Sequence, residues 1–151
     1  MIKTVWLNLP VKDLNKSKEF FRKLGFSFDT EHGNSEHSAC FVVGEDKFNV
    51  LLFPEKTFRG FTQNEIADTG KGTEVLISIG VETRAEVDEL ARKAFEAGGK
   101  VYAAPGEKQG WMYGCSFADL DGHRWNVLYM DSSKMPKAEG KLLRQLEENK
   151  K

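Results

Sequence analysis

One hairpin-like stretch occurs twice in this chain, and the repeat limits what the chain can fold into. The later copy spans Tyr113 to Met130, and the earlier copy spans Ala39 to Phe53. In each copy a cysteine opens an apolar run, an acidic turn with glycine follows, and a strand returns in the order basic, aromatic, Asn, Val, Leu. This match makes Asn49 the equivalent of Asn126. Two β-runs joined by an Asp/Gly turn indicate a hairpin, and the same hairpin written twice indicates two equivalent halves.

Each half also opens with a strand followed by a helix. Apolar residues alternate over 5–11 and over 74–82, which predicts strands with one aliphatic face. Asp13 stands at an N-cap position before one apolar helical stripe, and Thr83 with Glu86 forms a capping box before the other. The sequence therefore predicts the order strand, helix, strand, hairpin, taken twice.

The repeat also predicts the domain organisation. We expect a single domain over 1–131, made of a first half (1–54), a connector (55–72) and a second half (73–131). Thr62 to Glu65 has the form of another capping box and predicts a short helix in the connector. Residues 132–151 are rich in charge and are interpreted as a C-terminal tail.

Composition excludes several classes of partner. A chain of 151 residues with 40% hydrophobic residues can bury one ordinary core. Its formal net charge of -1 gives no long-range field that favours nucleic acid or an anionic membrane. No apolar run approaches bilayer length, and the two cysteines have no metal-type spacing, so we expect a cytoplasmic protein with reduced thiols.

The chain resembles the vicinal oxygen chelate superfamily in two stretches, VWLNLPVKDLNKSKEFFRKLGF (5–26) and YGCSFADLDGHRWNVLYMD (113–131). Within that superfamily it is most similar to the glyoxalase/bleomycin resistance proteins. The resemblance implies an α+β fold in which two βαβββ repeats form an eight-stranded open cup. It also implies that a ligand sits in the cup, commonly in a homodimer.

The resemblance further implies where a metal would bind. Metal-binding members place one ligand on the first strand and one on the last strand of each half, and these positions fall on Trp6, Asn49, Leu76 and Asn126. Indole and isobutyl groups offer no metal donor, and an Asn carbonyl is neutral and weak. We therefore expect no metal and no other cofactor.

The same positions suggest a pocket for a small molecule. Asn8 and Ser78 follow the two first-strand positions on the same strand face, so the inner surface would be partly polar and partly apolar. Asn49 and Asn126 lie in apolar strands and need hydrogen-bond partners. They bond either to the backbone or to each other, or they donate to a ligand in the cup.

Aromatic residues near the last hairpin have two interpretations. Trp111 and Tyr113 lie between glycines before that hairpin, and they form either the pocket wall or a core or dimer contact. In the first case Phe58 and Phe61 of the connector could close the pocket.

The histidines and cysteines give no catalytic pattern. His123 follows Asp-Gly in a turn, which favours a surface position. His32 and His37 lie in a polar loop with a spacing that matches no metal motif. Cys40 and Cys115 have no basic neighbour in sequence, so we expect structural thiols.

Three functions remain open at this point. The leading hypothesis is a protein that binds a small molecule in its cup without a metal. The first alternative is a metal-dependent, glyoxalase-like lyase or isomerase. The second is a dimeric interaction module without ligand, which a cup filled by Trp6, Leu76 and Trp125 would favour.

Overall fold

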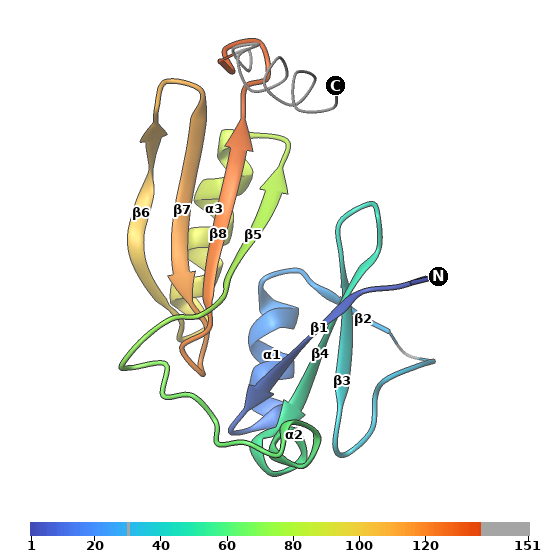
Figure 1. The fold of residues 1–151 in the computed structure, drawn as a ribbon. Coiled ribbons are helices and arrows are strands. Elements are labelled where there is room, and N and C mark those ends of the chain that lie inside the picture. Colours follow the sequence, from blue (N-terminus) through green and yellow to red (C-terminus); the bar gives the residue numbers. More distant parts are fainter. Residues whose placement is uncertain (30, 137–151) are drawn as a thin grey trace, which may run out of the picture.

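The computed structural model describes residues 1–29 and 31–136, which form two halves joined by a connector (Figure 1). The first half contains β1 (Trp6–Val11), α1 (Leu14–Lys23), β2 (Ser27–Phe28), β3 (Ala39–Val43) and β4 (Phe48–Pro54). The second half contains β5 (Leu76–Val81), α3 (Arg84–Glu96), β6 (Lys100–Lys108), β7 (Met112–Ala118) and β8 (Arg124–Met130). The predicted α+β class and the repeated βαβββ order are confirmed.

Local capping explains where the two long helices begin and end. The Asp13 carboxylate accepts a hydrogen bond from the backbone N–H of Lys16 at 3.0 Å and caps α1. Thr83 and Glu86 form the predicted reciprocal capping box at the start of α3. Gly25, with φ 96°, takes the left-handed conformation just after α1, where a residue with a Cβ atom would be strained.

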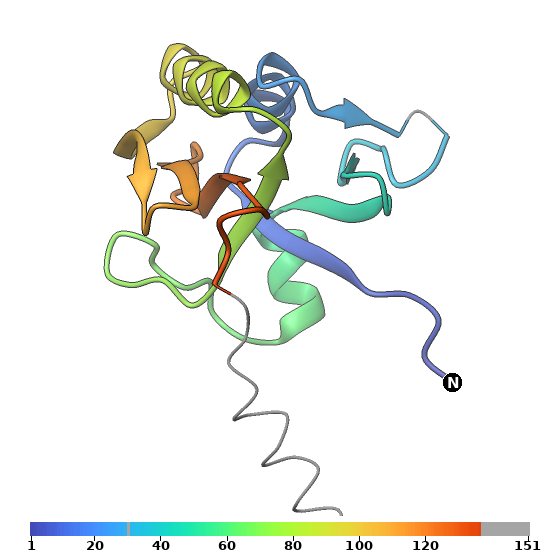
Figure 2. The same cartoon turned by 90° about the horizontal axis from the view of Figure 1, so that it is seen from above.

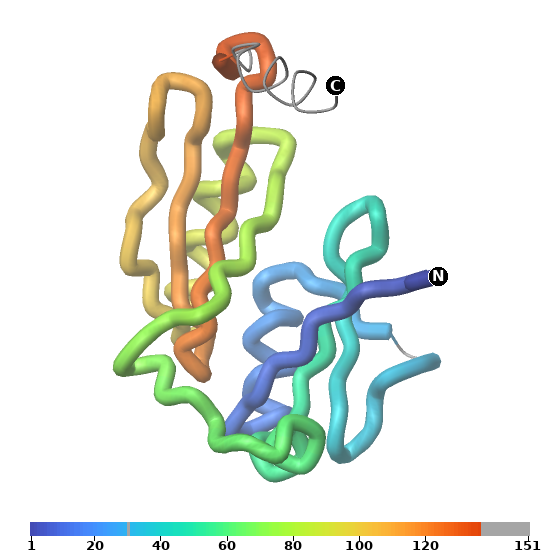
Figure 3. Tube along the Cα trace, in the orientation of Figure 1, coloured from blue at the N-terminus to red at the C-terminus, as the bar shows by residue number. Residues whose placement is uncertain are grey.

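The connector begins with a helix at a different position from the one that the sequence predicts. This helix, α2, spans Glu55–Thr62, directly after Pro54. The predicted helix start at Thr62 is wrong, because Thr62 is the last residue of α2 and Gln63 turns into the left-handed conformation (φ 50°). The position of α2 is set by packing, because the ring centroids of Phe61 in α2 and Phe53 in β4 are 5.0 Å apart. Figure 3 shows the chain running from α2 to β5 through a long irregular loop.

The described strands form two four-stranded mixed sheets. Their strand orders are β1-β4-β3-β2 and β5-β8-β7-β6. In each sheet the first strand of the half lies at one edge, parallel to the last strand of the same half. Helices α1 and α3 lie side by side on one side of the sheets, and α2 lies on the other (Figure 2).

Aromatic side chains join the halves in one core beneath α1 and α3. The Phe21 ring of α1 stacks on Phe41 of β3 with centroids 4.8 Å apart, and it lies 5.4 Å from Trp125 of β8. Phe117 of β7 stacks on Trp125 at 6.2 Å. All four side chains are fully buried, so both halves contribute to the same hydrophobic core.

The turn between β7 and β8 is organised by Asp119. One carboxylate oxygen accepts from the backbone N–H groups of Asp121 and His123, both at 3.0 Å. The other oxygen accepts from the indole N–H of Trp125 at 3.1 Å. Burial raises the pKa of Asp119, while the three N–H donors act in the opposite sense. The turn of the repeated hairpin is thus fixed by its own first acidic residue.

The same turn reaches across to the first half. The Asp121 carboxylate accepts from the Lys12 backbone N–H at 2.8 Å and from the Ser17 hydroxyl at 3.1 Å. Nε2 of His123 is 2.7 Å from the Pro10 carbonyl oxygen. The prediction that His123 lies on the surface is therefore wrong, because this residue is half-buried by a contact with a distant part of the chain. We call these contacts the joint between the halves.

Two further predictions concern the ends of the fold. Within residues 1–29 and 31–136, no helix is long and apolar enough to cross a membrane. The predicted tail, 132–151, lies outside the described residues from position 137 onward.

Candidate binding site on the open sheet faces

Each sheet has a face that points away from α1 and α3, and we call it the open face. Side chains alternate between the faces of a strand, and the opposite face of each sheet carries the buried core residues. Six of the eight predicted site residues lie on the open faces: Trp6, Asn8 and Asn49 on the first sheet, and Leu76, Ser78 and Asn126 on the second. Trp6 and Leu76 are 52% and 50% exposed, so neither open face is filled.

Strand pairing corrects the match between the two halves. Trp6 and Leu76 begin the first strand of their halves, but Trp6 pairs with Asn49 whereas Leu76 pairs with Arg124. In space, Asn49 is therefore equivalent to Arg124, and not to Asn126 as the sequence match predicts. A shift of two residues keeps each side chain on the same face, so alternation alone cannot detect it.

The side-chain carbonyl oxygens of both asparagines accept hydrogen bonds from side chains of neighbouring strands. Oδ1 of Asn126 accepts from the Ser116 hydroxyl at 2.7 Å, and Nδ2 of Asn126 is 3.4 Å from the Ser78 hydroxyl. Oδ1 of Asn49 accepts from the Cys40 thiol at 3.8 Å. Neither predicted alternative, a bond to the backbone or a bond between the asparagines, is found in the described part of the chain. The long contact to Ser78 leaves the Asn126 amide group able to donate more strongly to another acceptor.

Tyr113 does not share the open face with the six residues above, because it lies on the side of β7 that α3 covers. Its hydroxyl donates to the Asp88 carboxylate of α3 at 2.7 Å, and this hydrogen bond raises the pKa of Tyr113. Arg84 of α3 lies over its ring at 5.6 Å. Trp111 lies in the turn between β6 and β7, half-buried, with its carbonyl oxygen accepting from the Asp131 backbone N–H at 2.8 Å. The register of β7 places Tyr113 against the helix.

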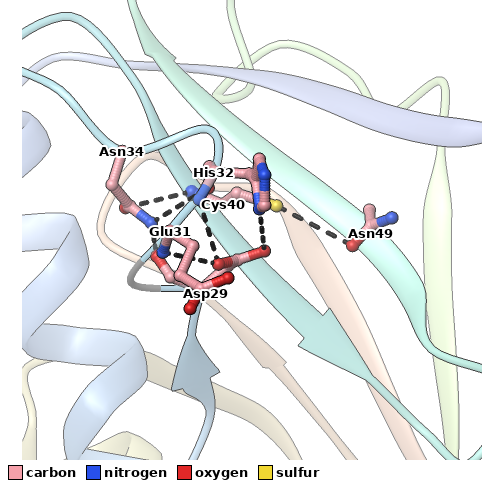
Figure 4. Close-up of polar contacts among 6 residues, drawn as sticks. All are labelled: Asp29, Glu31, His32, Asn34, Cys40 and Asn49. Atoms are coloured by element: carbon pink, nitrogen blue, oxygen red, sulfur yellow. Dashed lines mark hydrogen bonds and ion pairs between the residues drawn. The ribbon is translucent and has the colours of Figure 1, made fainter.

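The loop between β2 and β3 covers part of the first open face. Asn34 donates to the Asp29 carbonyl oxygen and accepts from the Cys40 backbone N–H at 3.3 Å (Figure 4). A Cβ atom at Gly33 would come within 2.7 Å of Cys40, which shows how closely this loop lies on β3. Cys40 shares its face with Asn49. The first open face is therefore partly closed at β3.

His32 belongs to the same loop and has a structural role. Its Nδ1 is 3.9 Å from the Asp29 carboxylate, and its side chain is largely exposed. The backbone N–H groups of Glu31 and His32 lower the pKa of Asp29 by bonding to its carboxylate (Figure 4). This is a local turn stabilised by an aspartate.

The open faces do not offer a donor set for a divalent metal. The resemblance places ligands at Trp6, Leu76, Asn126 and Asn49, and strand pairing replaces the last of these by Leu51. None of these groups is an imidazole or a carboxylate. Among the described residues, no group of three or more His, Cys, Asp and Glu side chains is arranged to hold a metal ion. The residues present therefore do not fit the metal that the family resemblance implies.

Both cysteines are buried free thiols. Burial raises the pKa of Cys115 to about 11, and its Sγ donates to the Val87 carbonyl oxygen at 3.7 Å. Burial also raises the pKa of Cys40. Both side chains therefore stay protonated at neutral pH, which agrees with the prediction of structural thiols.

Arg124 is a polar residue of the second open face that the sequence analysis did not single out. It pairs with Leu76, and its guanidinium carbon lies 4.2 Å from the centre of the Tyr102 ring. The period-two pattern of β8 could have identified it, because Arg124 and Asn126 are two residues apart and share one face.

Two hollows lie where the halves meet. One, of about 330 Å³, is formed by β1, α2, the connector and the first residues of β5 and β8, and its lining includes Asn8, Phe58 and Arg124. The other, of about 490 Å³, lies between the β3–β4 turn, the end of α1 and β5, and its lining includes Ser78. Of the eight predicted site residues, Asn8 lines the first of these hollows and Ser78 lines the second, and the other six line neither.

Comparison with known proteins identifies relatives of this fold. A family model described as bleomycin resistance protein-like N-terminal matches residues 3–44. A hypothetical protein from S. aureus has 40% sequence identity, with 85% of this chain and 94% of that chain covered and a TM-score of 0.76. A search of the curated proteins finds no match.

Two more distant solved structures share the fold. A glyoxalase/bleomycin resistance protein/dioxygenase family enzyme from Burkholderia phytofirmans has 19% identity over 83% of this chain and 96% of its own, with a TM-score of 0.70. A fosfomycin resistance protein from Listeria monocytogenes has 18% identity over 88% of this chain and 98% of its own, with a TM-score of 0.61. With its repeated βαβββ halves, the chain therefore has the fold of the glyoxalase/bleomycin resistance/dioxygenase proteins, and its residues 3–44 match the bleomycin resistance protein-like N-terminal family model.

Proposed function

We propose that the protein binds a small organic molecule on the open faces of its sheets, without a metal ion. The observation that carries this proposal is that Trp6 and Leu76 are half-exposed and that each shares its open face with a hydrogen-bonding amide, Asn49 for Trp6 and Asn126 for Leu76. Large apolar side chains left open next to a few placed polar groups are typical of small-molecule sites. The poor metal donors at the positions that the resemblance marks support a site that works without a metal.

Ligand titration of an Asn126 variant tests the proposal. Compounds that raise the melting temperature of the full chain are selected first and then titrated by calorimetry. Asn126→Leu should weaken their binding by about 1–3 kcal/mol, because the amide hydrogen bond is lost. Tyr113→Phe is the matched control, since Tyr113 lies on the helix-covered face, and it should leave affinity unchanged.

Two results would contradict the proposal. Unchanged affinity in Asn126→Leu would move the ligand away from the second open face. Near-stoichiometric nickel, zinc, iron or manganese that survives dialysis of the purified protein would support the alternative of a glyoxalase-like lyase or isomerase.

A dimeric interaction module is the second candidate. It is supported by the apolar residues Val75 and Leu76, which are 49% and 50% exposed at the start of an edge strand. A cup filled by Trp6, Leu76 and Trp125 would have favoured this candidate, but Trp125 lies on the helix-covered face. Sedimentation velocity tests this candidate: a stable dimer that Leu76→Ser dissociates, without any ligand found, would favour it.

A further inference from the structure

We propose that the second open face binds the acidic group of an organic anion, with the guanidinium of Arg124 as its cationic partner. This proposal rests on the proposed function, because it names the class of ligand for the same open face. Its basis is the environment of Arg124, which differs from that of the other arginines in the described part of the chain.

Arg124 has no acidic partner where the other arginines have one. The four other arginines in residues 1–29 and 31–136 each lie within 4.0 Å of a glutamate: Arg22 with Glu19, Arg59 with Glu65, Arg84 with Glu107, and Arg92 with Glu89 and Glu96. Arg124 forms no such ion pair with the described residues. Its charge is therefore available to a ligand.

The guanidinium of Arg124 is partly removed from water without a compensating hydrogen bond. Its Nε is buried and has no acceptor among the described residues. Its carbon lies 4.2 Å from the Tyr102 ring centre, and this contact orients the group without supplying an oxygen acceptor. A buried donor left unsatisfied costs about 1–3 kcal/mol, and such a group in a folded protein calls for a missing partner. A bound anion would supply the negative charge that this group lacks.

Neighbouring groups on the same face are also donors. The Asn126 amide nitrogen has only the 3.4 Å contact to the Ser78 hydroxyl, and both residues follow Arg124 and Leu76 along their strands. The open-face positions of β5, β7 and β8 contain no Asp or Glu: residues 76, 78 and 80, residues 112, 114, 116 and 118, and residues 124, 126, 128 and 130. This part of the face can therefore accept a negative group without repulsion.

Two carboxylates restrict the position of the anion. Glu65 and Glu74 line the same hollow as Arg124, and neither is within 4.0 Å of its guanidinium. They lie at the connector side of Arg124, so the acidic group of a ligand should point toward Asn126 instead. Leu76 remains half-exposed beside this position and offers an apolar contact.

The ligand class follows from these groups. Arginine presents a planar fork that matches the two oxygens of a carboxylate. Leu76 and Tyr102 beside it suit an aromatic or aliphatic body. We therefore expect an amphipathic carboxylate rather than a neutral or cationic compound.

A pair of probes that differ in charge tests the inference. The full chain is titrated by calorimetry with 2-naphthoate and with 2-naphthamide, which have the same ring system, and with octanoate as an aliphatic acid. The dissociation constant of naphthoate should be at least about tenfold lower than that of naphthamide, because a hydrogen bond to a charged group usually contributes that much to affinity. Its affinity should fall as salt is added, while that of naphthamide should not.

Two variants assign the effect to the residue. Arg124→Gln should remove the preference for naphthoate and leave naphthamide affinity within about twofold, because the charged donor is lost while the apolar side chains of Leu76 and Tyr102 remain. Arg84→Gln, which removes an arginine from α3 on the other side of the same sheet, should retain the preference. Arg124→Gln removes the unsatisfied Nε but also the contact with Tyr102, so its melting temperature should stay within a few degrees of that of the parent, which confirms folding.

The outcomes separate the two proposals. Equal affinity for naphthoate and naphthamide, or a preference that survives in Arg124→Gln, would overturn the anion site and leave a small-molecule site standing. Failure of naphthoate, naphthamide and octanoate all to bind would overturn the anion site and remove the support for ligand binding on this face.

Discussion

Replacing Asp121 by alanine should weaken the joint between the two halves. In the native protein its carboxylate accepts from the Ser17 hydroxyl at 3.1 Å and from the Lys12 backbone N–H at 2.8 Å. Ser17 is 2% exposed, so in Asp121→Ala its hydroxyl loses its partner in a place that water does not reach. An unsatisfied buried group costs about 1–3 kcal/mol, whereas the exposed Lys12 can bond to water. We expect a loss of about 2 kcal/mol in the free energy of unfolding.

Urea denaturation followed by tryptophan fluorescence measures this loss, because Trp125 lies in the shared core. Ser17→Ala and the double variant complete a mutant cycle, and the coupling energy should be about 1 kcal/mol or more. Asp46→Ala is the matched control, since Asp46 lies in the corresponding turn of the first half and is exposed. A loss below about 0.5 kcal/mol in Asp121→Ala, the range of ordinary surface changes, would refute the joint as a source of stability. So would a coupling energy of zero.

Three other expectations concern the core, a thiol and a hydrogen bond. Val127→Ala, at a fully buried position of β8, should cost about 2–3 kcal/mol in chemical denaturation through lost burial and a cavity. Because burial raises the pKa of Cys115 to about 11, mass spectrometry should show that this thiol is not alkylated by iodoacetamide at pH 8. For the same reason, the contribution of the protonated thiol to the free energy of unfolding should be full below pH about 9 and should decline as the pH rises toward 11. Tyr113→Phe removes the exposed hydrogen bond to Asp88, and the free energy of unfolding in the same denaturation assay should fall only slightly, because water can replace this bond.

Local sequence rules predicted the elements of the fold better than their relations in space. The cap residues Asp13 and Thr83 act as expected, because a cap depends on residues within one helical turn. The helix in the connector was misplaced, since Thr62 has the sequence of a cap, but packing of Phe61 on Phe53 determines where α2 lies. Tertiary contacts overrode the local signal there.

The candidate site shows the same limit. Alternation placed Trp6 and Leu76 on their faces, but it could not distinguish a register from one shifted by two residues, so Arg124 was overlooked. The surface position expected for His123 failed because its partner, the Pro10 carbonyl, is 113 residues away in the chain. No local pattern contains such a contact.

The shared aromatic core has a consequence for how the chain folds. Each half carries a complete βαβββ set, yet Phe21 and Phe41 of the first half pack directly on Trp125 of the second. A fragment that contained one half alone would leave these rings facing water, and it would lose a large share of the apolar burial that stabilises it. The halves should therefore unfold together in a single cooperative transition, and two separately produced fragments should gain structure only when they are mixed.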